Sequence, residues 1–139
     1  MVKTILTVVI LLISKFSFGQ NINIRISDLK SDKGICEVCL FNKADGFPDE
    51  SKNAVSCTKV KIKDKTASAS FKALKPANYA VVVYHDENNN SKLDTNFIGI
   101  PKEGIGVSNN AQQKMGKPKF EAAKFVLNAD KTLIINIKY

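Results

Sequence analysis

Short runs in which apolar and polar residues alternate are the feature of this sequence that most limits its fold. In the first run, at residues 21–29 (NINIRISDL), Ile22, Ile24 and Ile26 fall on one side and polar residues on the other, which is typical of a strand with one buried face. Further runs typical of strands cover residues 35–41, 54–63, 66–74, 79–84, 120–127 and 132–139. Turn residues separate these runs, and no helical period longer than two turns follows residue 20. The pattern predicts an all-β fold: a single-domain antiparallel β-sandwich of about seven strands with one long loop.

Local patterns indicate how some of these strands are arranged. Turn residues at 31–34 (SDKG) predict that the first two strands form a hairpin. The run at 79–84, YAVVVY, is apolar on both sides, which is typical of a central strand covered on both faces. Residues 86–118 form a long irregular segment rich in Asn, Gly, Ser and Pro, and segments of that length are usually functional. The run at 120–127 is expected to begin as a helical turn at 121–123 and to end as a strand.

The N-terminus has the pattern of a secretory signal peptide over residues 1–19. A lysine supplies the positive start, residues 4–13 form an apolar run, and Ser17 and Gly19 put small residues at the two positions that a signal peptidase recognises. A membrane anchor is the alternative, but it needs about 20 apolar residues. We therefore expect cleavage after Gly19 and no membrane span. The sandwich domain at 20–139 is expected to be exported to the periplasm or outside the cell.

The charge is basic, but its distribution argues against nucleic-acid binding. The formal net charge is +8, and loss of Lys3 and Lys15 with the signal peptide leaves +6. Arg25 is the single arginine among 21 basic residues, there is no tryptophan, and the lysines are scattered. Base recognition and tight phosphate binding favour arginine. We expect a protein or a glycan of the cell envelope as the partner, with weak attraction to anionic polymers or lipid surfaces left open.

Three cysteines allow at most one disulfide within the chain. Cys36 and Cys39 lie about 10 Å apart along one strand, which is too far for them to pair with each other. Cys39 shares the outward side of its run with Glu37, and Cys57 shares that of Lys59 in the next run. If these strands are neighbours, Cys39 and Cys57 could form a disulfide in an oxidising compartment. Three unpaired thiols are the alternative, and zinc is disfavoured because a closed site needs four suitably spaced ligands.

An acidic segment, HDENNNSKLDTN, follows the central apolar run. It places oxygen ligands at alternate positions, namely the side chains of Asp86, Asn88, Asn90 and Asp94 and the backbone carbonyl of Lys92. This spacing is typical of a loop that surrounds Ca²⁺, which takes six to eight oxygen ligands. Ser91 stands where glycine usually allows the sharp turn, and Phe97 where a bidentate glutamate is usual. Two interpretations stay open: a turn in which Asp and Asn side chains cap their own backbone, and a loop that binds calcium, which is the candidate cofactor.

Residues 78–111, NYAVVVYHDENNNSKLDTNFIGIPKEGIGVSNNA, closely resemble the signature of an uncharacterised bacterial family, domain of unknown function 2141. The resemblance continues at residues 118–125, which match the pattern Pro-x-Phe-x-x-Ala-x-Phe. Ser91 departs from the glycine that is usual in the family, and Ala77-Asn78 departs from a common Pro-Gly corner. The resemblance implies an exported sandwich of immunoglobulin-like or transthyretin-like kind, similar to carboxypeptidase-regulatory-like modules. It implies no activity, since sandwiches carry many unrelated functions.

These features give one main hypothesis for function and two alternatives. We expect an exported, non-enzymatic binding or accessory module of unknown ligand whose working surface is the loop at 86–111, ordered by calcium. Polar contacts to the partner are expected from Lys102, Glu103, Ser108, Asn109 and Asn110. The first alternative is a hydrolase-like enzyme with a site around His85, Asp86 and Glu103. The second is a purely structural envelope protein whose loop covers one end of the sandwich.

Overall fold

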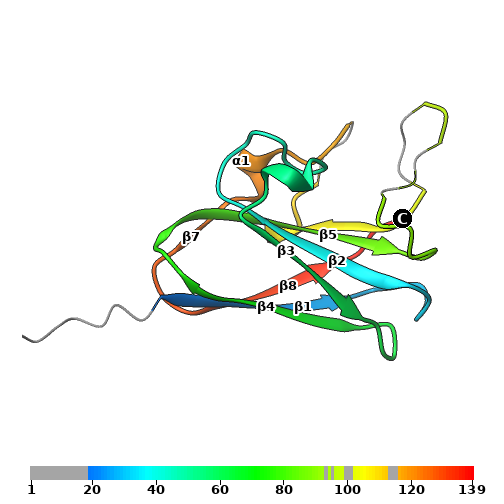
Figure 1. The fold of residues 1–139 in the computed structure, drawn as a ribbon, viewed down its shortest axis with the longest axis horizontal. Helices are drawn as coiled ribbons and strands as arrows, with labels where there is room; N and C mark the ends of the chain where they lie inside the picture. Colours follow the sequence, from blue (N-terminus) through cyan, green and yellow to red (C-terminus); the bar gives the residue numbers. More distant parts are fainter. Residues whose placement is uncertain (1–18, 93, 95, 99–101, 113–115) are drawn as a thin grey trace, which may run out of the picture.

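Two β-sheets stack face to face in the computed structural model, which describes residues 19–92, 94, 96–98, 102–112 and 116–139 (Figure 1). The smaller sheet has the order β4 (Ala67–Leu74), β1 (Gln20–Ser27), β8 (Lys131–Asn136). The larger sheet has the order β3 (Ser56–Lys61), β2 (Ile35–Phe41), β5 (Ala77–Asp86), β6 (Ile105–Val107), and β7 (Phe125–Leu127) pairs with the start of β5. The predicted all-β sandwich is confirmed. The predicted signal peptide lies outside the described residues except for Gly19.

Strand β1 shows how the alternating pattern produces the smaller sheet. Ile22, Ile24 and Ile26 are at most 1% exposed and belong to the core between the sheets, whereas Asn23 and Arg25 on the other side of the strand are exposed. Burial of each isoleucine is worth about 1.5–3 kcal/mol. A slip of one residue would turn all three side chains outward, so the register of β1 is strongly determined.

The predicted hairpin between the first two strands is wrong. β1 pairs with β4 and β8, whereas β2 pairs with β3 and β5, so the turn at 31–34 carries the chain from one sheet to the other. The physical reason is that the second half of β2 is buried on both faces, which suits the interior of the larger sheet. Two details of the prediction also change. β1 and β8 run parallel, and β6 adds an eighth strand inside the segment that was expected to be irregular.

Strand β5 is the central strand that its apolar sequence predicts. It pairs with β2 along one edge and with β6 and β7 along the other. Val81 and Val83 face the core between the sheets, while Ala80 and Val82 belong to a second apolar cluster on the outer face of the larger sheet. β5 is therefore covered on both faces, and it forms a rigid support that ends at Asp86.

The outer face of the larger sheet is covered by two short segments (Figure 1). One follows β2 and contains η1 (Ser51–Asn53), and the other contains α1 (Phe120–Ala123). Phe47 from the first segment packs edge-on against Phe41 of β2 and Phe120 of α1, with ring centroids 5.3 and 5.9 Å apart. The helical turn predicted at 121–123 and the strand predicted after it are confirmed as α1 and β7.

Cys39 and Cys57 face each other in the register of β2 and β3, and a disulfide joins them. Their Cα atoms lie 4.1 Å apart across this antiparallel pair. Cys36 is a free thiol buried between the sheets, and burial raises its pKa to about 12. The reactive thiolate form of Cys36 is therefore suppressed at ordinary pH.

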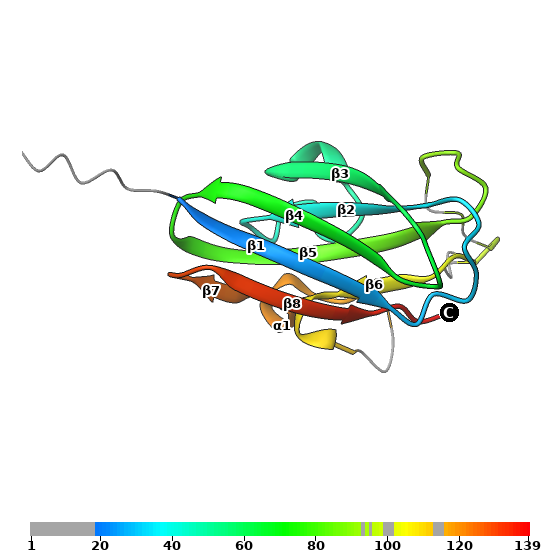
Figure 2. The ribbon, with the colours of Figure 1, turned by 90° about the horizontal axis from the view of Figure 1, so that it is seen from below.

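Figure 2 shows the smaller sheet lying across the larger one, with the C-terminus at the end where β1 and β8 finish. The loop after β5 leaves from this same end. Among the described residues, every helix falls short of the length and apolar character that a membrane crossing requires.

Candidate functional site: the loop that follows strand β5

The loop begins at a carboxylate that the sandwich holds in a fixed position. Asp86, the last residue of β5, is 2% exposed and pairs with Ile35 at the start of β2. Gly34 precedes that strand with φ +71°, and a Cβ atom there would lie 1.8 Å from the backbone oxygen of Asp86. Only glycine allows this close approach, so the turn at 31–34 helps to set where the loop starts.

Asp86 closes the first turn of the loop through its side chain. Its Oδ1 accepts a hydrogen bond from the backbone N–H of Asn90 (3.1 Å), and its Oδ2 accepts one from Ser91 (2.7 Å). Asn89 and Ser91 adopt positive φ angles of 55° and 61°. Ser91 thus takes up the left-handed backbone for which glycine is usual, and the sharp turn forms without glycine.

Three further side chains predicted as ligands meet one another in this loop. Asn88 Nδ2 donates to Asp94 Oδ2 (2.7 Å), and Asn90 Nδ2 donates to both carboxylate oxygens of Asp94 (3.0 and 3.2 Å). These bonds, from Asn90 first and then Asn88, lower the pKa of Asp94 below its ordinary value. Lys92 donates its backbone N–H to Asn90 Oδ1 (2.9 Å). All five predicted positions therefore belong to one turn. Side chains of the turn accept its own backbone N–H groups, as in the alternative in which Asp and Asn cap their own backbone.

Glu103 joins this group from the far side of the loop. It is 5% exposed, and it accepts hydrogen bonds from the backbone N–H groups of Glu87 (3.2 Å, to Oε1) and Asp94 (3.3 Å, to Oε2). Burial raises its pKa, and the neighbouring charges of Asp94 and Asp86 raise it further. The sequence predicts partner contacts for Glu103. It does not predict an ion ligand there, because Glu103 lies nine residues beyond Asp94 and outside the spacing of a single ion-binding loop.

Lysines surround this group without forming an ion pair with it. Lys59 Nζ donates to the hydroxyl of Ser91 (2.6 Å), and Lys30 pairs with Glu87 (3.1 Å). Among the described residues, no lysine, arginine or histidine lies within ion-pair distance of Asp86, Asp94 or Glu103. We call these three residues the carboxylate cluster. Hydrogen bonds from amide groups balance most of its negative charge, and the nearby charge of Lys102 also lowers the pKa of Asp94.

The segment Ser108–Asn110, which was expected to contact a partner, has an internal role. It forms the short helix η2, and the hydroxyl of Ser108, 0% exposed, donates to Ala123 O (2.6 Å) and accepts from Val81 N (2.9 Å). Asn109 Nδ2 donates to the carbonyls of Ala122 and Lys124, and Asn110 bonds both Ile134 O and Asn136 N. For Ser108 the expectation is wrong, because burial removes it from any partner. Lys102 is exposed and stays free for such contacts.

The hydrolase-like alternative loses its base in this structure. His85 is 0% exposed, its Nε2 donates to Lys33 O (2.7 Å), and its Nδ1 accepts from the hydroxyl of Tyr139 (2.6 Å). Tyr139 in turn accepts the backbone N–H of Lys30. Both ring nitrogens are thus used, and the ring has no access to a substrate. His85 fastens the C-terminus to the turn at 31–34.

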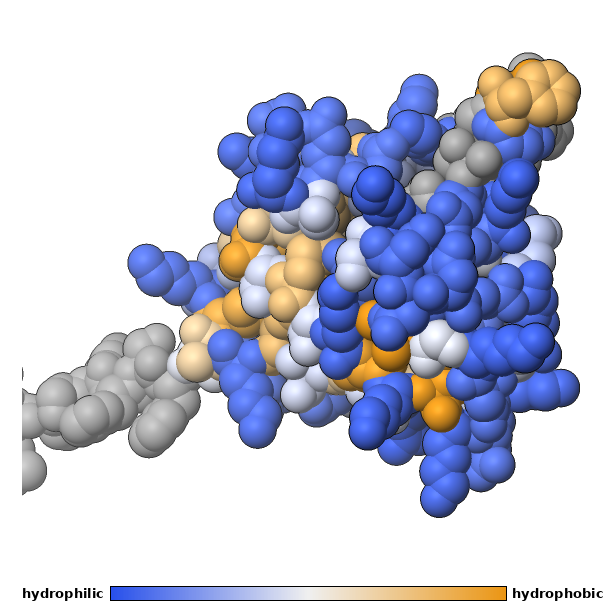
Figure 3. Space-filling view, turned by 45° about the vertical axis from the view of Figure 1, so that its right-hand side comes forward, coloured by the Kyte–Doolittle hydropathy of each residue, from blue (hydrophilic) through white to orange (hydrophobic). Residues whose placement is uncertain are grey.

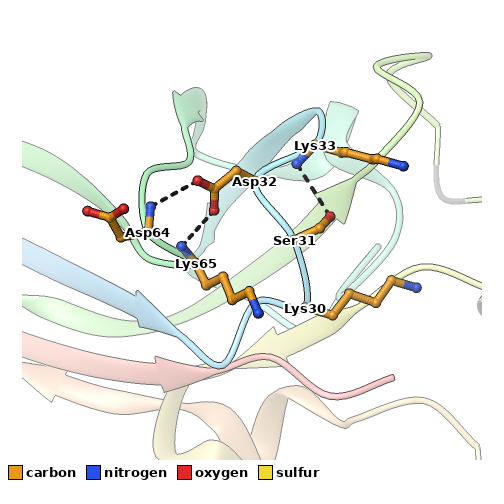
Figure 4. Close-up of a pocket in the computed structure, with 6 residues that line it drawn as sticks. All are labelled: Lys30, Ser31, Asp32, Lys33, Asp64 and Lys65. Carbon is orange, nitrogen blue, oxygen red and sulfur yellow. Dashed lines mark hydrogen bonds between the residues drawn. The ribbon is translucent and has the colours of Figure 1, made fainter.

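A hollow at the same end of the sandwich lies beside that turn (Figure 4). Asp32 accepts backbone N–H groups from Asp64 (3.1 Å) and Lys65 (2.7 Å), so the hollow is a contact between two turns. The side chains of Lys30 and Lys65 extend away from these bonds in Figure 4. No member of the carboxylate cluster lines it.

The fold and the loop together define a class of protein: a small two-sheet β-sandwich that displays one polar, carboxylate-bearing loop at the end of its central strand. The chain belongs to the family described as uncharacterised protein conserved in bacteria (DUF2141), whose profile matches residues 24–135. The match includes every described loop residue discussed above. No curated protein and no solved structure matches the chain.

Proposed function

We propose that this protein is an exported, non-enzymatic binding module whose long loop is ordered by a calcium ion. The carboxylate cluster is the observation that carries this proposal. Asp86 and Glu103 are 2% and 5% exposed, Asp94 lies beside Glu103, and within the part of the chain that the structure describes no basic side chain forms an ion pair with any of them. The charges of Asp94 and Asp86 both raise the pKa of Glu103, and carboxylates that interact in this way repel one another unless a cation or a proton compensates them. The three carboxylates do not all lie within 4.8 Å of one another, so a bound calcium ion would have to draw them together.

The donor set suits a hard cation. Calcium prefers carboxylate and amide oxygens and tolerates irregular geometry. The amide groups of Asn88 and Asn90 now direct nitrogen at Asp94. A half-turn of each amide exchanges nitrogen for oxygen at the same place. With calcium between them, both amide oxygens and the carboxylates of Asp94 and Glu103 would face the ion, while Asp86 keeps its turn bonds and still has lone pairs to offer.

Export is supported by two features of the described residues. β1 begins at Gln20, so cleavage after Gly19 would leave the first strand whole. The disulfide between Cys39 and Cys57 belongs to an oxidising compartment. The intact mass of the secreted protein, measured without reductant, should correspond to a chain that begins at Gln20. After unfolding without reductant, one cysteine thiol should react with an alkylating reagent. A retained N-terminus or three alkylated thiols would contradict export of this form.

The calcium part is tested by titrating the exported protein with CaCl₂ and, separately, with MgCl₂. At a free concentration ten times Kd, calcium should stabilise the fold by about 1.4 kcal/mol, which raises the melting temperature by roughly 5 °C. Magnesium should act more weakly, because it demands a near-ideal octahedral shell. The absence of both binding heat and a melting shift at millimolar calcium would end the proposal.

Matched variants separate the cluster from general surface charge. Asp94→Asn and Glu103→Gln should each weaken calcium binding by about tenfold or more, because each variant removes a charged ligand. Asp45→Asn and Glu121→Gln remove the same charge from exposed positions outside the loop. These controls should bind calcium as the unmodified protein does. If the control variants lost as much calcium affinity as the cluster variants, calcium binding would be an effect of overall surface charge and the proposed site would be wrong.

A further inference from the structure

The tip of the loop exposes two large apolar side chains next to each other. Phe97 is 100% exposed and Ile98 is 65% exposed. The side chain of Asn96 accepts the backbone N–H of Ile98 at 3.1 Å, which forms a tight turn over Asn96–Ile98. Phe97 occupies the middle of this turn, and its side chain is fully exposed. The hydrogen bond that closes the turn therefore helps to present the ring to solvent.

This tip stands apart from the rest of the apolar surface. In Figure 1 the loop after β5 projects from the end of the sandwich, and Figure 3 shows an orange group at the far end of a projection, apart from the orange areas on the body of the same face. Val126 and Ile134 are also exposed, 63% and 61%, but each is a single side chain on a strand between polar or buried neighbours. Isolated apolar residues of that kind are normal, whereas a projecting pair marks an interaction site.

The shape and charge of the surroundings favour a lipid surface as the occupant. A specific protein partner usually covers about 800 Å² on each side, and two side chains on a convex tip offer only part of that area. A bilayer accepts a projecting apolar group without a matching groove, and aromatic rings are favoured in its interfacial region. The loop itself carries Lys92 and Lys102 against four acidic residues, but the chain without its signal peptide carries +6. The basic chain as a whole therefore attracts anionic headgroups.

We propose that Phe97 and Ile98 form a membrane-docking tip that inserts into the interfacial layer of an anionic bilayer. The inference rests on the proposed function in one respect, because the calcium-ordered loop is the element that presents the tip. Lys92 and Lys102 bring the loop to the surface, and the two apolar side chains then hold it there. Calcium adds to binding by neutralising the carboxylate cluster at the base of the loop, which anionic lipid would otherwise repel.

The test is sedimentation of the exported protein with two kinds of vesicle. Anionic vesicles contain phosphatidylcholine and phosphatidylglycerol in 1:1 proportion, and neutral vesicles contain phosphatidylcholine alone. The variants Phe97→Ser and Ile98→Ser should each lower the partition coefficient on anionic vesicles by roughly tenfold. Val126→Ser is the matched control for Ile98→Ser, since Val126 is 63% exposed against 65% for Ile98, and it should partition as the unmodified protein does. Neutral vesicles should bind more weakly, and high salt should reduce binding to the anionic ones.

Three outcomes would overturn the docking tip. Phe97→Ser could bind as well as the unmodified protein, which would assign binding to lysines alone. The unmodified protein could fail to bind anionic vesicles with or without calcium. A change of oligomeric state in Phe97→Ser without any vesicle binding would assign the tip to a second copy of the chain.

Calcium titration of the same samples separates the two proposals. If calcium binds but vesicles do not, the docking tip is wrong and the proposed calcium site stands. If Phe97-dependent vesicle binding occurs while calcium gives neither binding heat nor a melting shift, the calcium site is wrong and the docking tip stands.

Discussion

Two asparagine-rich segments lie next to strand β5: Ser108–Asn110, and the loop that follows Asp86. They differ in whether their side chains bond to other elements or within the segment itself. Ser108–Asn110 directs its side chains at backbone groups of β5, α1 and β8, so every bond ties one element to another. Asn88 and Asn90 direct theirs at Asp94 within the same loop. The first arrangement is complete in itself. The second concentrates charge and leaves it partly exposed, which is the arrangement that the proposed binding site requires.

The largest effect should come from the internal segment. Ser108→Ala removes a hydroxyl that satisfies Val81 N and Ala123 O in a fully buried place. Leaving two buried backbone groups unpaired should lower the free energy of unfolding by about 3 kcal/mol. Denaturant unfolding measures this value, and calcium affinity should change less than about twofold, because additive effects are expected between separate sites. Ser70→Ala, at an exposed position of β4, is the matched control. Equal stability of the two variants would break the comparison.

Sequence patterns predicted much of the fold because burial of single strands is a local property. The isoleucines of β1 and the doubly apolar β5 could be identified from alternation alone. Strand pairing could not, since the turn at 31–34 has the same residues whether it closes a hairpin or crosses between sheets. Which strands pair depends on contacts between distant parts of the chain, and the parallel pairing of β1 with β8 left no local sign.

The candidate site was predicted only in part for the same reason. The alternating oxygen ligands from Asp86 to Asp94 follow from spacing within one turn. Glu103 returns to the turn through the packing of β6 and could not be found by spacing. Ser108 and Asn109 were grouped with the loop because polar residues in an irregular segment look alike in sequence. The burial of Ser108 and the backbone partners of both residues distinguish them only in three dimensions.

Tyr84 gives an intermediate effect and tests the strand between the two segments. Its hydroxyl donates to Pro48 O (2.6 Å), and burial, followed by the charges of Asp49 and Glu37, raises its pKa well above the usual range. The folded state therefore favours the protonated tyrosine. Unfolded tyrosine titrates near pH 10, so this contribution is complete below about pH 10 and is lost above it, by about 1.4 kcal/mol for each pH unit.

Denaturant unfolding at a series of alkaline pH values should therefore show stability falling above about pH 10, and less steeply in Tyr84→Phe. Tyr139 contributes to the remaining fall, because burial raises its pKa as well. Tyr79→Phe removes a similar hydroxyl-to-carbonyl bond, to Lys75 O, and is the control for loss of a tyrosine hydroxyl as such. A parallel pH profile for Tyr84→Phe and the unmodified protein would show that β5 is not anchored through Tyr84. The two segments would then lack a shared rigid support.

The smallest effect on stability should come from Asn90→Ala in the loop, and this variant best tests how the loop differs from Ser108–Asn110. Asn90 is exposed, and among the described residues its side chain bonds Asp94 and the backbone of Lys92. Without calcium, the free energy of unfolding should change by no more than about 0.5 kcal/mol, as for other surface substitutions. With calcium, loss of one oxygen ligand should weaken binding by roughly tenfold. Asn42→Ala, exposed in the segment after β2, should change neither quantity. A large loss of stability in calcium-free Asn90→Ala would mean that this loop is a structural joint like Ser108–Asn110, because a binding turn can lose a ligand without weakening the fold that presents it.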